Sequence, residues 1–121
     1  MNRKFVYIIS PMRGRPRHNA DAIFAAHKRL EDSGEGWTVI TPLGFARSFG
    51  IDCDAPDEAI PADRLRDCMK AELAAIPHLD AVYLLKGWER SEGAREELRV
   101  ALENKLIVMV EGNENGAEVA Q

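Results

Sequence analysis

The sequence predicts an α/β fold in which helices cover both faces of a parallel sheet. Short runs rich in β-branched, aliphatic and aromatic residues are typical of buried strands, and they lie at Lys4–Ile9, Trp37–Thr41, Ala81–Leu85 and Lys105–Val110. Between successive runs, apolar residues recur at helical spacing. Strands that alternate with helices pair in parallel through right-handed crossovers. We therefore expect a three-layer flavodoxin-like or Rossmann-like sheet of four to five strands.

Length and composition predict one domain. The 121 residues leave room for a single core, which we place in residues 1–110. Residues 111–121 are polar and lack periodicity, so we expect a disordered tail. The apolar run before Ser10 is too short for a signal peptide or a membrane span, which favours a soluble, cytoplasmic protein.

Charge and cysteine content exclude several function classes. The formal net charge of -4 makes the chain as a whole a poor binder of nucleic acids and of acidic membranes. Cys53 and Cys68 match neither a disulfide framework nor the spacing of a zinc site. We expect no metal and no cofactor.

The first helix should begin at Asn19 as its N-cap and end near Ser33 and Gly34. Its predicted apolar stripe consists of Ala20, Ile23, Phe24, His27 and Leu30. A single histidine within such a stripe is more often a core residue than a ligand, and we interpret His27 in that way.

The twenty residues Leu43–Ala62 contain two glycines and two prolines without sustained periodicity, which predicts a long loop. A lid or a subunit contact is a plausible role for it. The second helix should then be capped by Asp63. Its expected apolar stripe consists of Leu65, Cys68, Met69, Leu73 and Ile76.

Two acidic residues fall on apolar helix faces. Glu72 projects from the middle of the second stripe, and Glu97 lies within the apolar arc of a third helix expected from Ser91 to Glu103. A carboxylate on a buried face is costly unless it is paired or used in chemistry. Structural burial with a hydrogen-bond partner remains the alternative.

Two segments can bind an anion. In the first loop, Gly14 lies among Arg13, Arg15 and Arg17, and the loop contains neither a dinucleotide fingerprint nor a P-loop. This loop can hold a phosphate or be merely a solvated basic loop.

The second segment is the start of the third helix. Ser91 can cap it and leave the N–H groups of Gly93 and Ala94 facing a ligand, or be a plain cap. Trp88 can stack on a flat ligand or seal the core.

These residues resemble a known superfamily. The segment Ser91–Glu97 is similar to the helix-entry signature of nucleoside 2-deoxyribosyltransferases and the related 2′-deoxynucleoside 5′-phosphate N-hydrolases, and Ser10–Arg15 resembles their first-loop motif. An uncharacterised branch of that superfamily, frequent in phages and prophages, is closer still. Its pattern is met at Ser10–Gly14, Asn19, Phe24, Leu30, Gly34, Pro42, Asp80, Gly87–Glu89, Ser91, Gly93, Ala94 and Glu97. The resemblance covers residues 4 to about 110.

The resemblance implies a glutamate nucleophile that attacks C1′ of a deoxynucleoside and releases the base. Glu97 matches the nucleophile, and Glu72 matches the second carboxylate, which helps to position the sugar or the leaving base. Ser91 matches the residue that contacts the 5′-phosphate, and Arg13 with Gly14 match the first-loop phosphate contacts. The full set of predicted substrate- or phosphate-binding residues also includes Ser10, Met12, Trp88 and Gly93. The chain departs from the superfamily in two places: Glu72 replaces an aspartate, and Glu96 replaces a tyrosine.

The expected function is cleavage or transfer at the N-glycosidic bond of a deoxynucleoside or its 5′-monophosphate, in a homodimer or higher homo-oligomer. One alternative is a non-catalytic nucleotide-binding or sensor module of the same fold. Another is a purely structural α/β subunit.

Overall fold

A computed structural model of the protein describes residues 4–112. Within this range the chain forms a four-stranded parallel sheet of β1 (Lys4–Ile9), β2 (Trp37–Ile40), β3 (Ala81–Leu84) and β4 (Ile107–Val110). The strand order is β2-β1-β3-β4, which is the flavodoxin-like order with one strand fewer. The predicted fold class is confirmed.

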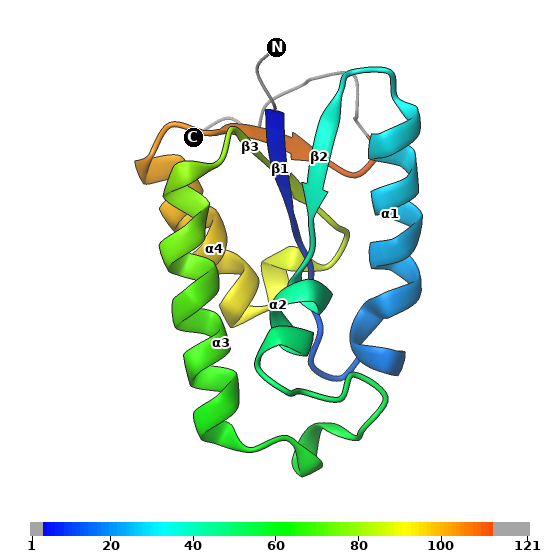
Figure 1. The fold of residues 1–121 in the computed structure, drawn as a ribbon, viewed down its shortest axis with the longest axis vertical. Helices are drawn as coiled ribbons and strands as arrows, with labels where there is room; N and C mark the ends of the chain where they lie inside the picture. The colour runs from blue at the N-terminus through cyan, green and yellow to red at the C-terminus, as the bar shows by residue number, and fades with distance from the viewer. Residues whose placement is uncertain (1–3, 113–121) are drawn as a thin grey trace.

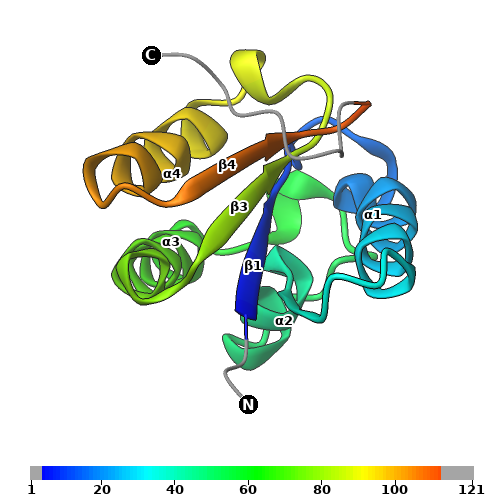
Figure 2. The ribbon, with the colours of Figure 1, turned by 90° about the horizontal axis from the view of Figure 1, so that it is seen from above.

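Helices cover both faces of the sheet. Helix α1 (Ala20–Asp32) packs on one face, while α3 (Ala62–Ala75) and α4 (Glu92–Glu103) lie side by side on the other (Figures 1 and 2). Because successive strand residues point to opposite faces, Val6 and Ile8 of β1 pack toward α1, whereas Tyr7 and Ile9 pack toward α3 and α4. This alternation sends the Tyr7 side chain into the layer that carries the two unusual glutamates.

The long segment predicted as a loop contains a helix, so that prediction is wrong in part. Helix α2 spans Pro42–Ser48, and a 3₁₀ turn, η2, spans Asp57–Ala59. The Thr41 hydroxyl oxygen caps α2 by accepting the N–H of Gly44 at 3.2 Å, and Pro42 occupies the first turn. The Thr-Pro pair is a standard signal for a helix start, and strand β2 ends at Ile40 because Thr41 serves as this cap.

The start of α1 differs from the prediction. Asn19 does not cap the helix through its side chain; it has a φ of 68°, and its amide donates to the Ser10 hydroxyl at 2.9 Å. Arg17 and His18 also adopt positive φ. Three successive left-handed residues other than glycine cost roughly 1–2 kcal/mol each, so other contacts must hold this turn.

Several smaller expectations need correction. Phe24 is 52% exposed and therefore does not belong to the core stripe. His27 is half-buried and lies 3.1 Å from a Glu31 carboxylate oxygen. Asp63 lies inside the first turn of α3, which begins after Pro61 without a side-chain cap.

The end of the described chain is anchored to the sheet. Strand β4 begins at Ile107 rather than Lys105, because Lys105 takes a positive φ in the preceding turn. The Glu111 carboxylate accepts the N–H of Lys86 at 2.8 Å. The rest of the predicted disordered tail, residues 113–121, lies outside the described residues. Among the helices of residues 4–112, none combines the length and apolar character needed to cross a membrane.

Candidate functional site

The candidate site lies at the topological switch point of the sheet, where the strand order changes direction between β1 and β3. Strand β1 pairs with β2 on one side and with β3 on the other, so the loops that follow β1 and β3 leave the sheet side by side at its carboxyl edge. Crevices at such points bind ligands in open parallel sheets. Here the crevice is bounded by the first loop, α3 and the start of α4.

Two buried carboxyl groups share one phenol at this crevice. Glu72 of α3 is 8% exposed and Glu97 of α4 is 5% exposed. The fully buried Tyr7 hydroxyl lies 2.5 Å from Glu72 Oε2 and 2.9 Å from Glu97 Oε2. Side chains from one strand and two helices therefore converge on a single cluster, which we call the carboxyl pair with its bridging tyrosine.

The hydrogen-bond geometry constrains the protons of this cluster. A phenol carries one hydrogen and can donate to only one of the two oxygens at a time. The second contact is favourable only when that carboxyl group is itself protonated. The arrangement is thus best satisfied when the pair holds one proton and carries one negative charge.

The pKa values of the two glutamates agree with a pair that holds one proton. Burial raises the pKa of Glu72 to about 7, although its hydrogen bonds to Tyr7, Cys68 and Glu97 oppose the shift. Burial also raises the pKa of Glu97 well above its usual range, and the negative charge of Glu72 adds to that rise. Burial, followed by repulsion from both glutamates, raises the pKa of Tyr7, so the phenol remains a neutral donor.

Cys68 gives Glu72 a second partner one helical turn away. Its thiol lies 3.9 Å from Glu72 Oε1. Burial and the neighbouring carboxyl groups raise the pKa of Cys68 to about 12, so the group stays a protonated, weak donor. Both oxygens of Glu72 are therefore held in place.

A groove of about 920 Å³ gives access to the carboxyl pair. Its walls include the predicted residues Ser10, Met12, Arg13, Ser91 and Gly93, together with Glu72 and Glu97. Met69 of α3 packs close to Gly93, where a β-carbon would lie 3.0 Å from the methionine methyl group. Gly93 therefore allows α3 to approach the start of α4 closely.

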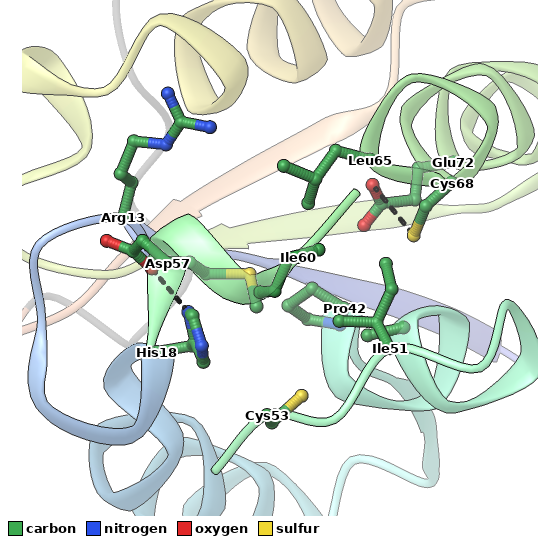
Figure 3. Close-up of a pocket in the computed structure, with 12 residues that line it drawn as sticks. Arg13, His18, Pro42, Ile51, Cys53, Asp57, Ile60, Leu65, Cys68 and Glu72 are labelled. Atoms are coloured by element: carbon green, nitrogen blue, oxygen red, sulfur yellow. Dashed lines mark hydrogen bonds and ion pairs between the residues drawn. The ribbon is translucent and has the colours of Figure 1, made fainter. Parts of the chain in front are cut away.

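A smaller, mainly apolar chamber of about 140 Å³ adjoins the groove (Figure 3). Its lining residues include Pro42, Ile51, Ile60, Leu65 and Cys68. Glu72 and Leu65 line both spaces, so the chamber meets the groove beside the carboxyl pair. In Figure 3 the Arg13 side chain points away from the apolar chamber residues.

The Asp57 carboxylate fastens the outer wall of the chamber to the first loop through two contacts. Asp57 accepts the Gly14 N–H at 2.9 Å, and its other oxygen lies 3.1 Å from His18 Nδ1. The second ring nitrogen of His18 lies 2.9 Å from the carbonyl oxygen of Ala55. These contacts hold the left-handed turn at Arg17–Asn19 against its conformational cost.

Two predicted ligand contacts lie elsewhere. The Gly14 N–H is already bonded to Asp57, and Gly14 does not line the groove. Trp88 packs against the core beneath α4 and does not line the groove either, which corresponds to its alternative interpretation as a core residue.

The start of α4 confirms Ser91 as the helix cap, but the prediction that the Ala94 N–H faces a ligand is wrong. The Ser91 hydroxyl oxygen accepts the N–H of Ala94 at 3.2 Å and caps the helix. The Ala94 N–H is therefore occupied, which leaves the N–H groups of Glu92 and Gly93 without a described protein partner. Both of these residues line the groove.

Sequence reasoning missed Tyr7 and Arg90, and it named Arg15 only as one of three arginines in a loop that can hold a phosphate. Tyr7 lies in a continuous apolar strand, where a tyrosine is indistinguishable from an ordinary core residue. Its position, two residues before the carboxyl end of β1, could have marked it as a site residue, because the carboxyl ends of parallel strands face the crevice. The groove-lining positions of Arg15 and Arg90 depend on how two separate loops fold together.

The family comparison covers nearly the whole described chain. A family model described as "Domain of unknown function (DUF4406)" matches residues 4–110. The chain belongs to this family. A search of curated proteins returned no match. All the residues of the groove and the chamber lie within the DUF4406 match.

The donor set of this DUF4406 domain consists of carboxyl, phenol and guanidinium groups. Among residues 4–112, no grouping of three or more histidine, cysteine, aspartate or glutamate side chains is placed to hold a metal ion. The described buried side-chain nitrogen and oxygen atoms all have hydrogen-bond partners. The buried polar atoms of the carboxyl pair thus all have hydrogen-bond partners. Which of the two carboxyl groups is protonated decides what chemistry the pair can perform.

Proposed function

We propose that this protein cleaves or transfers at the N-glycosidic bond of a deoxynucleoside or its 5′-monophosphate. The observation that carries the proposal is the carboxyl pair: Glu72 and Glu97 are buried, bridged by Tyr7 and open to a groove at the sheet's carboxyl edge. The resemblance to nucleoside 2-deoxyribosyltransferases supports the same assignment. Glycosidic cleavage with retention uses two carboxyl groups in different protonation states.

The first step divides the work between the two carboxyl groups. Glu97, as a carboxylate, attacks C1′ while the bond from C1′ to the base nitrogen breaks, and the electron pair of that bond leaves with the base. Glu72 gives its proton to the departing base. The products are a glycosyl ester on Glu97, the free neutral base and an ionised Glu72. A pKa of about 7 suits Glu72 to this role, because a proton donor works best near the operating pH.

The second step reverses the proton transfer. The Glu72 carboxylate takes a proton from water, whose oxygen attacks C1′ and breaks the ester bond to Glu97. Both carboxyl groups return to their starting states, and the sugar leaves with a hydroxyl at C1′. A second nucleobase in place of water makes the reaction a transfer.

Tyr7 places the proton of the pair on the required residue. When its hydroxyl donates to Glu97, the nucleophile is ionised and the proton resides on Glu72. When it donates to Glu72, the reverse holds. Since the hydroxyl contacts both oxygens, a two-proton relay interconverts the two forms: the phenol gives its own proton to the ionised carboxylate and accepts the proton of the other carboxyl group.

The surrounding walls match the parts of a nucleotide. The apolar chamber meets the groove at Glu72, so the base lies at the chamber and the sugar at Glu97. Arg13 and the free N–H groups at the start of α4 take the 5′-phosphate. In this arrangement the proton donor, Glu72, lies beside the base, and the nucleophile, Glu97, lies beside C1′.

The test is a panel of nucleosides and 5′-monophosphates assayed for free base, with and without a second base as acceptor. Base release above the uncatalysed rate supports the proposal, and exchange of bases identifies a transferase. Binding of nucleotides without any base release contradicts it.

One observation favours a second candidate, a nucleotide-binding module without turnover. The pKa of Glu97 is raised well above its usual range, and a protonated Glu97 cannot attack C1′. In such a module the protein binds its ligand with Glu97 protonated and unreactive. The same panel separates the two, because a binding module raises its melting temperature with ligand yet releases no base.

A further inference from the structure

We infer that the groove contains a second anion subsite, formed by Arg15 and Arg90, so that the protein accepts nucleotides with two linked phosphates. The inference rests on the proposed function for the placement of the base and sugar. It goes beyond that function because a single 5′-phosphate needs only Arg13 and the start of α4.

Three unpaired guanidinium groups line one groove. Arg13, Arg15 and Arg90 are all exposed groove residues. Among residues 4–112 none of them has a carboxylate within ion-pair distance, although the chain carries a net charge of -4. By contrast, Arg17 and Arg99 are paired with neighbouring carboxylates. Unpaired arginines gathered at one opening indicate an anionic ligand.

Arg15 and Arg90 lie on the same side of this groove. The Arg15 side chain lies directly over Gly87, since a β-carbon on that glycine would be 2.1 Å from Arg15 Nη2. Gly87 and Arg90 belong to one short turn, in which the Arg90 N–H donates to the Gly87 carbonyl at 3.1 Å. Arg15 therefore packs on the turn that carries Arg90, and that turn leads directly to the Ser91 cap.

The charges of the groove fit more than one phosphate. A terminal phosphate carries about two negative charges at neutral pH, and a second linked phosphate adds about one more. Besides the carboxyl pair, two acidic residues line the groove, Glu92 and Glu96. Glu96 accepts the Nε–H of Arg99 at 3.1 Å, whereas Glu92 has no described ion-pair partner. Three arginines and two free helix N–H groups exceed what one monophosphate requires.

The groove also has the necessary room. Its volume of about 920 Å³ lies near the upper end of the range for small-molecule sites, roughly 300–1,000 Å³. The apolar chamber adds separate space for a base. The groove therefore has room for a nucleotide that carries a second phosphate.

The experiment measures the affinity of orthophosphate, pyrophosphate, and a matched nucleoside 5′-monophosphate and 5′-diphosphate by calorimetry. The parent chain is compared with Arg90→Ala and Arg15→Ala. Arg66→Ala is the control because Arg66 is an exposed arginine of α3 that does not line the groove. We expect the diphosphate to bind about tenfold more tightly than the monophosphate. Either variant should remove most of that gain and change monophosphate binding by less than about threefold, while Arg66→Ala retains it.

Two results overturn the inference. One is equal affinity of the parent for mono- and diphosphate, and the other is an equal loss for both ligands in Arg90→Ala and Arg15→Ala. If the diphosphate gains nothing while monophosphates still release their base, the subsite is wrong and the proposed function stands. If pyrophosphate binds through Arg15 and Arg90 but no nucleotide releases its base, the subsite stands and the proposed function fails.

Discussion

The two sides of the groove are built in opposite ways. The carboxyl pair comes from helices packed on the sheet, and its members are buried and held by Tyr7 and Cys68. The groove arginines come from the first loop and from the turn before α4, and they are exposed, with no described ion-pair partner. A group that is buried and fixed has a shifted pKa, whereas an exposed one stays charged and mobile. In the proposed function, the first side breaks the bond and the second attracts the ligand.

This contrast predicts different consequences for substitutions on each side. Changes in the carboxyl pair should alter the reaction rate and the pH dependence of folding stability. Changes among the arginines should alter ligand affinity, and this effect should weaken as salt rises because exposed charges are screened.

The largest effect is expected from Glu97→Gln. Glutamine keeps the shape and hydrogen-bonding capacity of a protonated Glu97 but cannot attack C1′, so base release should fall by several orders of magnitude. Ligand affinity should change little. The matched control is Glu103→Gln, an exposed glutamate on the same helix. A Glu97→Gln variant with near-parental base release would remove the nucleophile assignment.

A smaller loss of rate is expected from Glu72→Gln. Removing a proton donor typically lowers the rate by about 10²–10⁴-fold. The loss should be smallest for substrates whose base leaves readily without protonation. Asp67→Asn, at an exposed position on α3, is the control. If all substrates lose the same factor, Glu72 does not protonate the leaving base.

The carboxyl pair should also make the folded state less stable as pH rises. The pKa of Glu72 is raised from 4.5 to about 7 by burial, so the folded state binds this proton more tightly than the unfolded state does. The resulting stabilisation is fully present below pH 4.5 and is lost as pH rises to about 7. Its upper size is about 3 kcal/mol.

Chemical denaturation at several pH values measures this effect. The free energy of unfolding of the parent should fall between pH 4.5 and 7 more steeply than that of Glu72→Gln, which has no proton to lose. Parallel pH profiles for the two proteins would show that Glu72 titrates normally in the folded chain.

The smallest effect is expected on the arginine side. Arg13→Ala should weaken 5′-monophosphate binding by roughly 1.5–3 kcal/mol and leave nucleoside binding nearly unchanged. Calorimetry at two salt concentrations measures both affinities, and Arg66→Ala again serves as the control. Equal losses for the nucleotide and the nucleoside would place Arg13 away from the phosphate.

Local patterns predicted the carboxyl side well. The strands follow from continuous apolar runs, and the start of α4 follows from the Ser91 cap. Glu72 and Glu97 were found because an acidic residue within an apolar stripe breaks a simple periodic pattern. Tyr7 was missed because it breaks no pattern: its ring packs as a core residue, and only its hydroxyl reaches the carboxyl pair.

The loop side was harder to predict because its structure depends on contacts between distant segments. The left-handed turn at Arg17–Asn19 is fixed partly by Asp57, which lies far along the chain. The Gly14 N–H donates to the same aspartate, and Gly14 does not line the groove. Helix α2 was also missed, although the Thr41-Pro42 pair is a local signal for its start. The predicted homo-oligomer stays a prediction, which sedimentation at micromolar concentration tests.

Detection of a glycosyl ester on Glu97 tests the assignment of the nucleophile. The protein is mixed with a deoxynucleotide whose sugar carries a 2-fluoro substituent to slow the second step, quenched in acid and digested for mass spectrometry. We expect a peptide containing Glu97 that is heavier by one fluorinated sugar phosphate, and no such peptide from Glu97→Gln. Base release without any adduct at Glu97, or an adduct at another residue, would contradict this assignment.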